Sequence, residues 1–166
     1  MQTENELSEI LGEPIRHDIS GHKSAYISTF YNPKTALFCD LEDKSHSSLH
    51  SNALPAFFGI LPEGNCIADF IKEKGLACGV QFSYFTLKAL ANLGEYEAEL
   101  SLITNETDHS WANMLCEGAT TCFEAWGKSQ KWNTSLCHPW ASSPIIAIVE
   151  DLAPNFPDKL RIVPLD

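Results

Sequence analysis

The sequence lacks the features that mark membrane-spanning, nucleic-acid-binding and nucleotide-binding proteins. It has no run of 18 apolar residues, so we expect no segment to span a bilayer. Lys and Arg number 11 against 22 Asp and Glu, and the net charge of -11 disfavours phosphate backbones and anionic membranes as partners. It also contains no phosphate-binding loop, no G-x-G-x-x-G and no G-x-S-x-G motif.

The N-terminus and the cysteines indicate a reducing compartment. The first residues carry acids and no apolar run, which does not match a secretory signal. No C-x-x-C pair occurs, and the cysteines lie at the irregular positions 39, 66, 78, 116, 122 and 137. We therefore expect reduced, mostly buried thiols and a cytoplasmic protein, with no disulfide framework.

The composition is that of an ordinary single globular domain. Of the 166 residues, 44% are hydrophobic and 20% charged. A chain of this length buries roughly 70% of its unfolded surface, which is enough for one core.

Apolar residues at helical spacing predict a chain of short antiparallel helices. The corners share a pattern, because each ends one apolar stripe at a leucine and begins another after Gly12, Pro62-Glu63-Gly64 or Gly94. Stacked helical hairpins and a generic helical bundle explain this pattern equally well. Residues 96–103 fit either a helix or a strand. The predicted helices cover residues 4–11, 14–31, 48–60, 66–74, 81–93 and 108–115.

Two segments do not fit the helical pattern. Residues 36–39 are too short to classify and read as a brief strand or an extended loop. Residues 153–166 are broken by prolines, and Leu160 to Val163 look like a lone strand. We expect a helical domain over residues 1–152 and the start of a following β-domain over residues 153–166.

Glu124 is the first candidate for catalysis. It is flanked by Phe123 and Trp126 in an otherwise apolar run. Apolar walls penalise the charged carboxylate, so we expect the pKa of Glu124 to be raised toward neutrality. The competing interpretation is an exposed glutamate on a turn.

His138 and Trp140 form a second candidate site. Pro139 restricts the backbone of His138 to extended or turn conformations. An imidazole beside an indole suits a sugar, because the imidazole binds a hydroxyl and the indole covers a ring face. A structural histidine under a tryptophan is the competing interpretation.

His46 and His50 are spaced as helical zinc ligands, but Ser47 stands where a metalloprotease has glutamate. We therefore expect no metal and no cofactor, and interpret the pair as part of a cluster that orders the entry to a helix. A solvated acidic loop is the preferred interpretation of Asp40, Glu42 and Asp43.

Two segments resemble the α-L-rhamnosidases of glycoside hydrolase family 78. Residues 118–126, with the sequence GATTCFEAW, resemble the family's G-A-T-T-x-W-E-x-W segment. Residues 135–144, with the sequence SLCHPWASSP, resemble its S-x-x-H-x-W/Y-x-x-x-P segment. Residues 30–35 and 46–52 are also similar to the family. Phe123 departs from it, because members carry tryptophan there.

The resemblance implies an all-α (α/α)6 barrel of six hairpins and an inverting hydrolase of terminal α-L-rhamnosides that needs no cofactor. It gives Glu124 the role of general base and His138 a contact to the sugar. Trp126 and Trp140 would shape the same pocket.

The length departs from the family. A barrel of twelve helices needs roughly 350 residues. No segment here matches the aspartate-rich motif that carries the family's general acid. We therefore expect the C-terminal part of a catalytic domain, roughly half a barrel, which the missing half would complete. The alternative is a non-catalytic helical module that binds sugars or a partner.

Overall fold

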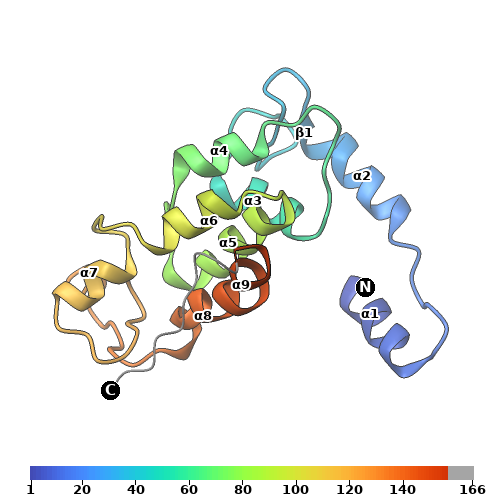
Figure 1. Ribbon diagram of the computed structural model, residues 1–166. Coiled ribbons are helices and arrows are strands. Elements are labelled where there is room, and N and C mark those ends of the chain that lie inside the picture. Colours follow the sequence, from blue (N-terminus) through green and yellow to red (C-terminus); the bar gives the residue numbers. More distant parts are fainter. Residues whose placement is uncertain (157–166) are drawn as a thin grey trace.

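The computed structural model describes residues 1–156, which form an all-α protein with one small two-stranded sheet (Figure 1). The all-α prediction is therefore confirmed, whereas the expected strand at Leu160 to Val163 lies outside the described residues. In chain order the elements are α1 (Gln2–Leu11), α2 (Ser20–Phe30), β1 (Tyr31–Asn32), β2 (Leu37–Phe38), α3 (Leu49–Phe57), α4 (Ile67–Lys74), η1 (Val80–Phe82), α5 (Ser83–Asn92), α6 (Tyr96–Ile103), α7 (Trp111–Cys116), η2 (Pro139–Ser142), α8 (Ser143–Ala147), η3 (Ile148–Leu152) and α9 (Ala153–Asn155). Within residues 1–156, no helix has both the length and the apolarity needed to cross a membrane.

Helix α2 begins later than the sequence pattern predicts, at Ser20 instead of Pro14. The Asn5 side chain accepts from the backbone N–H of His17 at 3.0 Å and donates to its carbonyl at 2.7 Å. Because the N–H and the carbonyl of His17 are bonded to Asn5, they are not available for hydrogen bonds within a helix. Asp18 then accepts from the backbone N–H of Ser20 at 2.9 Å, just before the N-cap residue Ile19. Figure 1 shows α1 set apart from the other helices by this extended segment.

Helix α3 begins where its cap predicts. The Ser48 hydroxyl accepts from the backbone N–H of Ser51 at 3.1 Å, and the Ser51 hydroxyl accepts from the backbone N–H of Ser48 at 3.1 Å. This reciprocal pair satisfies two N–H groups that the first turn leaves without helical partners.

Residues 36–39 contain strand β2, which pairs antiparallel with β1 through Tyr31 and Phe38.

The turn between α5 and α6 contains Gly94, whose φ of 76° lies in the left-handed region that favours glycine. Residues 96–103 form helix α6, which settles the choice between helix and strand. A strand was suggested by the alternation of charged and apolar residues at Glu95, Glu97 and Glu99. In the structure Glu99 is fully buried within the helix.

Two hydrophobic clusters form the core. The first joins β2 to α3, α4 and α5 and includes Phe38, Ala53, Ile71 and Leu90. The second joins the turn after α4 to α7 and the loop that follows it, and its buried members are Leu76, Val80, Met114, Phe123, Trp126 and Ala141. The second cluster positions the loop that carries Glu124.

The C-terminal helical run extends past the expected domain boundary at residue 152. Helix α8 passes into the π-helical turn η3 and then into α9, so residues 153–155 are helical. Pro154 lies in the first turn of α9.

A buried charge cluster ties η3 to α5 and α6. The Nζ atom of Lys88 lies 2.7 Å from Oδ1 of Asp151 and 3.2 Å from Oε2 of Glu150. Beside them, Glu99 is fully buried and neither of its carboxyl oxygens has a hydrogen-bond partner among the described residues. Burial, followed by the negative charge of Asp151, raises the pKa of Glu99 to about 8.

We predict that the free energy of unfolding falls as pH rises between about 4.5 and 8. In this window the folded chain keeps a proton on Glu99, whereas the unfolded chain, with the ordinary pKa of 4.5, has released it. One such proton gives a slope of at most about 1.4 kcal/mol per pH unit. Urea unfolding at a series of pH values measures the slope.

Glu99→Gln should flatten this slope, because the amide does not titrate. Glu73→Gln, on the exposed side of α4, serves as the matched control and should keep it. An unchanged slope in Glu99→Gln would show that Glu99 is not the group responsible.

Candidate functional site

The loop between α7 and η2 is closed on itself by backbone hydrogen bonds. The N–H of Glu124 donates to the carbonyl of Ser135, and the N–H of His138 donates to the carbonyl of Cys122, both at 2.8 Å. The Thr121 hydroxyl adds a bond of 2.5 Å to the carbonyl of Leu136. The two segments that carry the sequence motifs therefore lie side by side.

The Glu124 carboxylate is held by two donors from the same loop. Its Oε1 accepts from the ammonium group of Lys131, and its Oε2 accepts from the backbone N–H of Ser135 at 3.0 Å. The side chain is 17% exposed. Both bonds stabilise the charged form of the carboxylate.

The expectation of a raised pKa for Glu124 is therefore wrong. The Lys131 ammonium, followed by the Ser135 N–H, lowers the pKa of Glu124 below its ordinary value. The charge of His138 adds a smaller contribution in the same direction. Phe123 and Trp126, the apolar neighbours that suggested a raised pKa, are each 2% exposed and belong to the core, and the effect of burial on the pKa of Glu124 is smaller than that of the two donors.

Trp126 connects this loop to the turn after α4. Its indole N–H donates to the carbonyl of Cys78 at 2.7 Å, and its ring meets that of Trp111 edge to face at a centroid distance of 4.9 Å. One hydrogen bond thus satisfies the only polar atom of a buried indole.

A surface pocket of about 530 Å³ opens beside the carboxylate. It brings together Glu124 and Trp126, two of the four predicted site residues. Among the described residues that line it, Glu124 is the only one with a carboxyl group. The lining comprises Ala77, Cys78, Gly79, Val80, His109, Glu124, Ala125, Trp126, Gln130 and Lys131.

His138 and Trp140 lie outside that lining. Their rings are 4.0 Å apart between centroids at an angle of 40°. Trp140 is 43% exposed and lines a separate groove of about 440 Å³ together with Tyr84, Phe85 and Ile146. Of the four predicted residues, Glu124 and Trp126 therefore line one pocket and Trp140 lines the other groove, whereas His138 lines neither.

Three residues at the site were not predicted to be functional from the sequence. Lys131 and Ser135 hold the carboxylate, and His109 and Lys131 line the pocket. Lys131 lies in a stretch without periodicity, so nothing in the sequence pattern pointed to it. For His109 there was a weak signal, because it follows Asp108 in a polar pair just before a predicted helix.

The histidines near α3 do not form a pair. His46 bonds to Asp40, whose carboxylate also accepts from the Ser48 hydroxyl at 2.6 Å, so this cluster orders the loop before the helix. His50 packs instead against Phe82 at a centroid distance of 3.9 Å. Within residues 1–156 no group of three His, Cys, Asp or Glu side chains could hold a metal ion.

The six cysteines are free thiols, as expected, but most of them are not buried. Only Cys39 and Cys78 are buried, whereas Cys66, Cys116 and Cys137 are exposed. The expectation of mostly buried thiols is therefore wrong, because Cys116 at the end of α7 and Cys137 in the following loop lie at the surface.

The short helices, with a pocket beside a carboxylate on a connecting loop, place the chain in the class of all-α helical-hairpin domains. The family model of the bacterial α-L-rhamnosidase six-hairpin glycosidase domain matches residues 14–149. The chain therefore belongs to this family, and the suspected relationship to rhamnosidases is confirmed. Comparison with curated proteins and with solved structures gives no match.

We predict that Lys131→Met raises the pKa of Glu124 toward the ordinary value of 4.5, because the substitution removes the largest stabilising partner of the carboxylate. The side-chain carboxyl carbon of Glu124, followed by NMR against pH, gives this pKa directly. Lys128→Met removes a lysine of the same loop that bonds to the Glu117 carbonyl instead, and it should leave the titration of Glu124 unchanged. Equal titration curves in the two variants would contradict the assignment.

Proposed function

We propose that the chain supplies the general-base side of the site in an inverting α-L-rhamnosidase-like hydrolase of terminal α-L-rhamnosides. Glu124 is the general base. The observation that carries the proposal is that the Lys131 ammonium and the Ser135 N–H hold the Glu124 carboxylate in its charged form beside an open pocket. A general base must be deprotonated before it can accept a proton.

In the proposed reaction, water attacks the anomeric carbon of the sugar from the face opposite the leaving group. The new bond forms between the water oxygen and the anomeric carbon, and the glycosidic bond breaks. Glu124 takes the proton from the attacking water, while a carboxylic acid across the site protonates the leaving oxygen. The lowered pKa keeps Glu124 charged in mildly acidic medium, although it also makes the carboxylate a weaker base.

His138, Trp126 and Trp140 are proposed to contact or shape the sugar site. Support for His138 comes from its backbone bond to Cys122 and from its electrostatic effect on Glu124. Trp126 forms the wall of the pocket that Glu124 lines. Trp140 packs against the His138 ring at a tilt of 40°.

The general acid is proposed to come from a part of the barrel outside this chain. Inverting hydrolysis needs two carboxyl groups roughly 6.5–9.5 Å apart. The described lining of the Glu124 pocket contains one. A six-hairpin barrel has twelve α-helices, whereas residues 1–156 form nine, of which α9 has three residues.

The apolar groove at Trp140 supports the same proposal, because a second half-barrel would cover it. Ile145 and Val149 are each 64% exposed next to this groove. Exposed apolar surface of this kind is typical of an interaction site.

A non-catalytic module that binds sugars or a partner remains the alternative function, since it would use the same groove and pocket. The free thiols fit the cytoplasmic location that we propose.

We predict that the 166-residue chain by itself does not hydrolyse methyl α-L-rhamnoside, because an alkoxide leaving group must be protonated and the pocket holds a base without an acid. Release of free L-rhamnose measures this. Sustained turnover would assign the acid to a carboxyl group of this chain and overturn the proposal of a missing half.

In the assembled barrel, Glu124→Gln should lower kcat by about a hundredfold to ten-thousandfold with little change in KM, because the amide cannot accept the proton from water. Asp43→Asn, in the acidic loop before α3, is the control and should keep full activity. Unchanged turnover in Glu124→Gln would show that Glu124 is not the general base.

A further inference from the structure

Two side chains at the end of α7 hold the loop that follows it. The Asn113 side chain donates to the carbonyl of Trp126 at 2.9 Å and to Oε1 of Glu117 at 3.3 Å. Oε2 of Glu117, the residue that ends α7, accepts from the backbone N–H of Lys128 at 2.6 Å. These contacts bind the loop backbone on both sides of Gly127. We call Asn113 and Glu117 the α7 clamp.

Gly127 leaves the space that the clamp occupies. The residue is buried, and a Cβ atom there would lie 2.6 Å from Oε1 of Glu117 and 3.1 Å from Nδ2 of Asn113. The φ angle of Gly127 is not in the left-handed region. Glycine is therefore required here by the close approach of the carboxylate and not by the shape of the turn.

Gly127 also begins the turn that leads to Lys131. The backbone N–H of Gln130 donates to the carbonyl of Gly127 at 3.2 Å. The Gln130 side chain donates to the backbone carbonyl of Asp108 at 3.0 Å. The clamp thus fixes the beginning of the turn, and the loop before α7 fixes its end.

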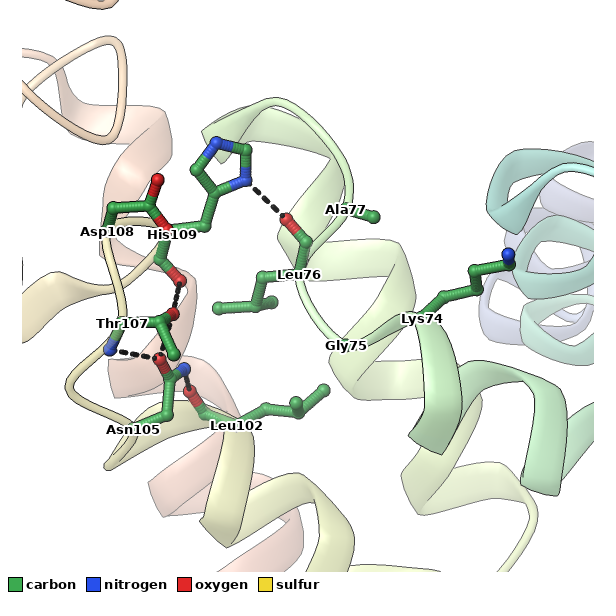
Figure 2. Close-up of a pocket in the computed structure, with 9 residues that line it drawn as sticks. All are labelled: Lys74, Gly75, Leu76, Ala77, Leu102, Asn105, Thr107, Asp108 and His109. Carbon is green, nitrogen blue, oxygen red and sulfur yellow. Dashed lines mark hydrogen bonds between the residues drawn. The ribbon is translucent and has the colours of Figure 1, made fainter.

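The loop before α7 is itself ordered. Figure 2 shows the Asn105 side chain, which donates to the Leu102 carbonyl at 2.6 Å and accepts from the backbone N–H of Thr107 at 3.0 Å. In the same view, Nδ1 of His109 lies 3.1 Å from the carbonyl of Leu76. The helix and the loop before it therefore form a fixed support for the turn.

Lys131 depends on this support because its side chain is long and 41% exposed. Holding a flexible lysine in one geometry costs conformational entropy, so an isolated ion pair of this kind contributes little. The cost falls when the backbone already presents the ammonium group to its partner. The turn at 127–130 therefore decides whether the Lys131 ammonium stays on Glu124.

We infer that Asn113 and Glu117 are positioning residues for Glu124, because they hold the turn from which Lys131 reaches the carboxylate. Neither of them is among the described residues that line the Glu124 pocket, so they act through Lys131 and do not touch the substrate. The catalytic meaning of this inference rests on the proposed function. The structural link from Glu117 to Glu124 is independent of it.

The test measures the pKa of Glu124 by NMR in the 166-residue chain after the clamp is broken in two ways. Glu117→Ala removes the carboxylate that holds the N–H of Lys128. Gly127→Ala keeps this carboxylate but displaces it, and the end of a flexible side chain moves aside at little cost to the fold. In both variants the pKa of Glu124 should rise, because Lys131 loses its fixed position. The rise should be smaller than in Lys131→Met, since the lysine is still present.

The direction of the change separates positioning from a simple charge effect. Loss of the negative charge of Glu117 would by itself stabilise the charged form of Glu124 and lower its pKa. A lowered or unchanged pKa in Glu117→Ala would therefore overturn the inference. Glu106→Ala removes an exposed acid of the loop before α7 and is the charge-matched control. It should not raise the pKa, and an equal rise there would also overturn the inference.

The double variant Glu117→Ala/Gly127→Ala tests whether the two substitutions act on one contact. Once the carboxylate is absent, the closest atom that the new Cβ would displace is gone. The double variant should therefore titrate like Glu117→Ala alone. Rises that add would show two independent effects and would overturn the clamp.

Titration and turnover distinguish the inference from the function on which it rests. In the assembled barrel, a raised pKa of the base should move the acidic limb of the pH profile of kcat to higher pH in Gly127→Ala. A limb that stays in place while the titration of Glu124 moves would keep the positioning role and overturn the role of Glu124 as general base.

Discussion

The site depends on the pairing of residues 122–124 with residues 135–138. Two backbone hydrogen bonds of 2.8 Å close the loop, and a third N–H, that of Ser135, donates to the Glu124 carboxylate. Without this closure Lys131 would have no fixed position relative to Glu124. The Glu124 carboxylate is held by hydrogen bonds from a backbone N–H and from Lys131, both in its own loop, so neither bond comes directly from a helix.

The loop in turn depends on the core beneath it. Phe123 and Trp126 are buried and pack in the cluster formed by Leu76, Val80 and Met114. The same segment thus contributes two aromatic residues to the core and one carboxylate to the surface. Alternation of this kind lets a short irregular loop hold a reactive group rigidly, because the apolar side chains on either side are close-packed.

The sequence anticipated much of the fold because its signals are local. Ser48 as a cap, Gly94 at a corner and the apolar stripes of α4 and α5 each depend on residues within a few positions. The start of α2 escaped prediction because Asn5, twelve residues earlier, binds the backbone of His17. Burial likewise made a helix of residues 96–103, where the alternating charges suggested a strand.

By itself the sequence determined the all-α class and the membership in the six-hairpin family, together with the positions of the two motifs. It also named Glu124 as the carboxylate to examine. Only the tertiary structure decided that this carboxylate is held in its charged form, that His138 and Trp140 lie apart from its pocket, and that Glu99 is buried. The reason is physical, because a pKa and a cavity depend on groups that meet in space, as Trp126 meets the Cys78 carbonyl across 48 positions of the chain.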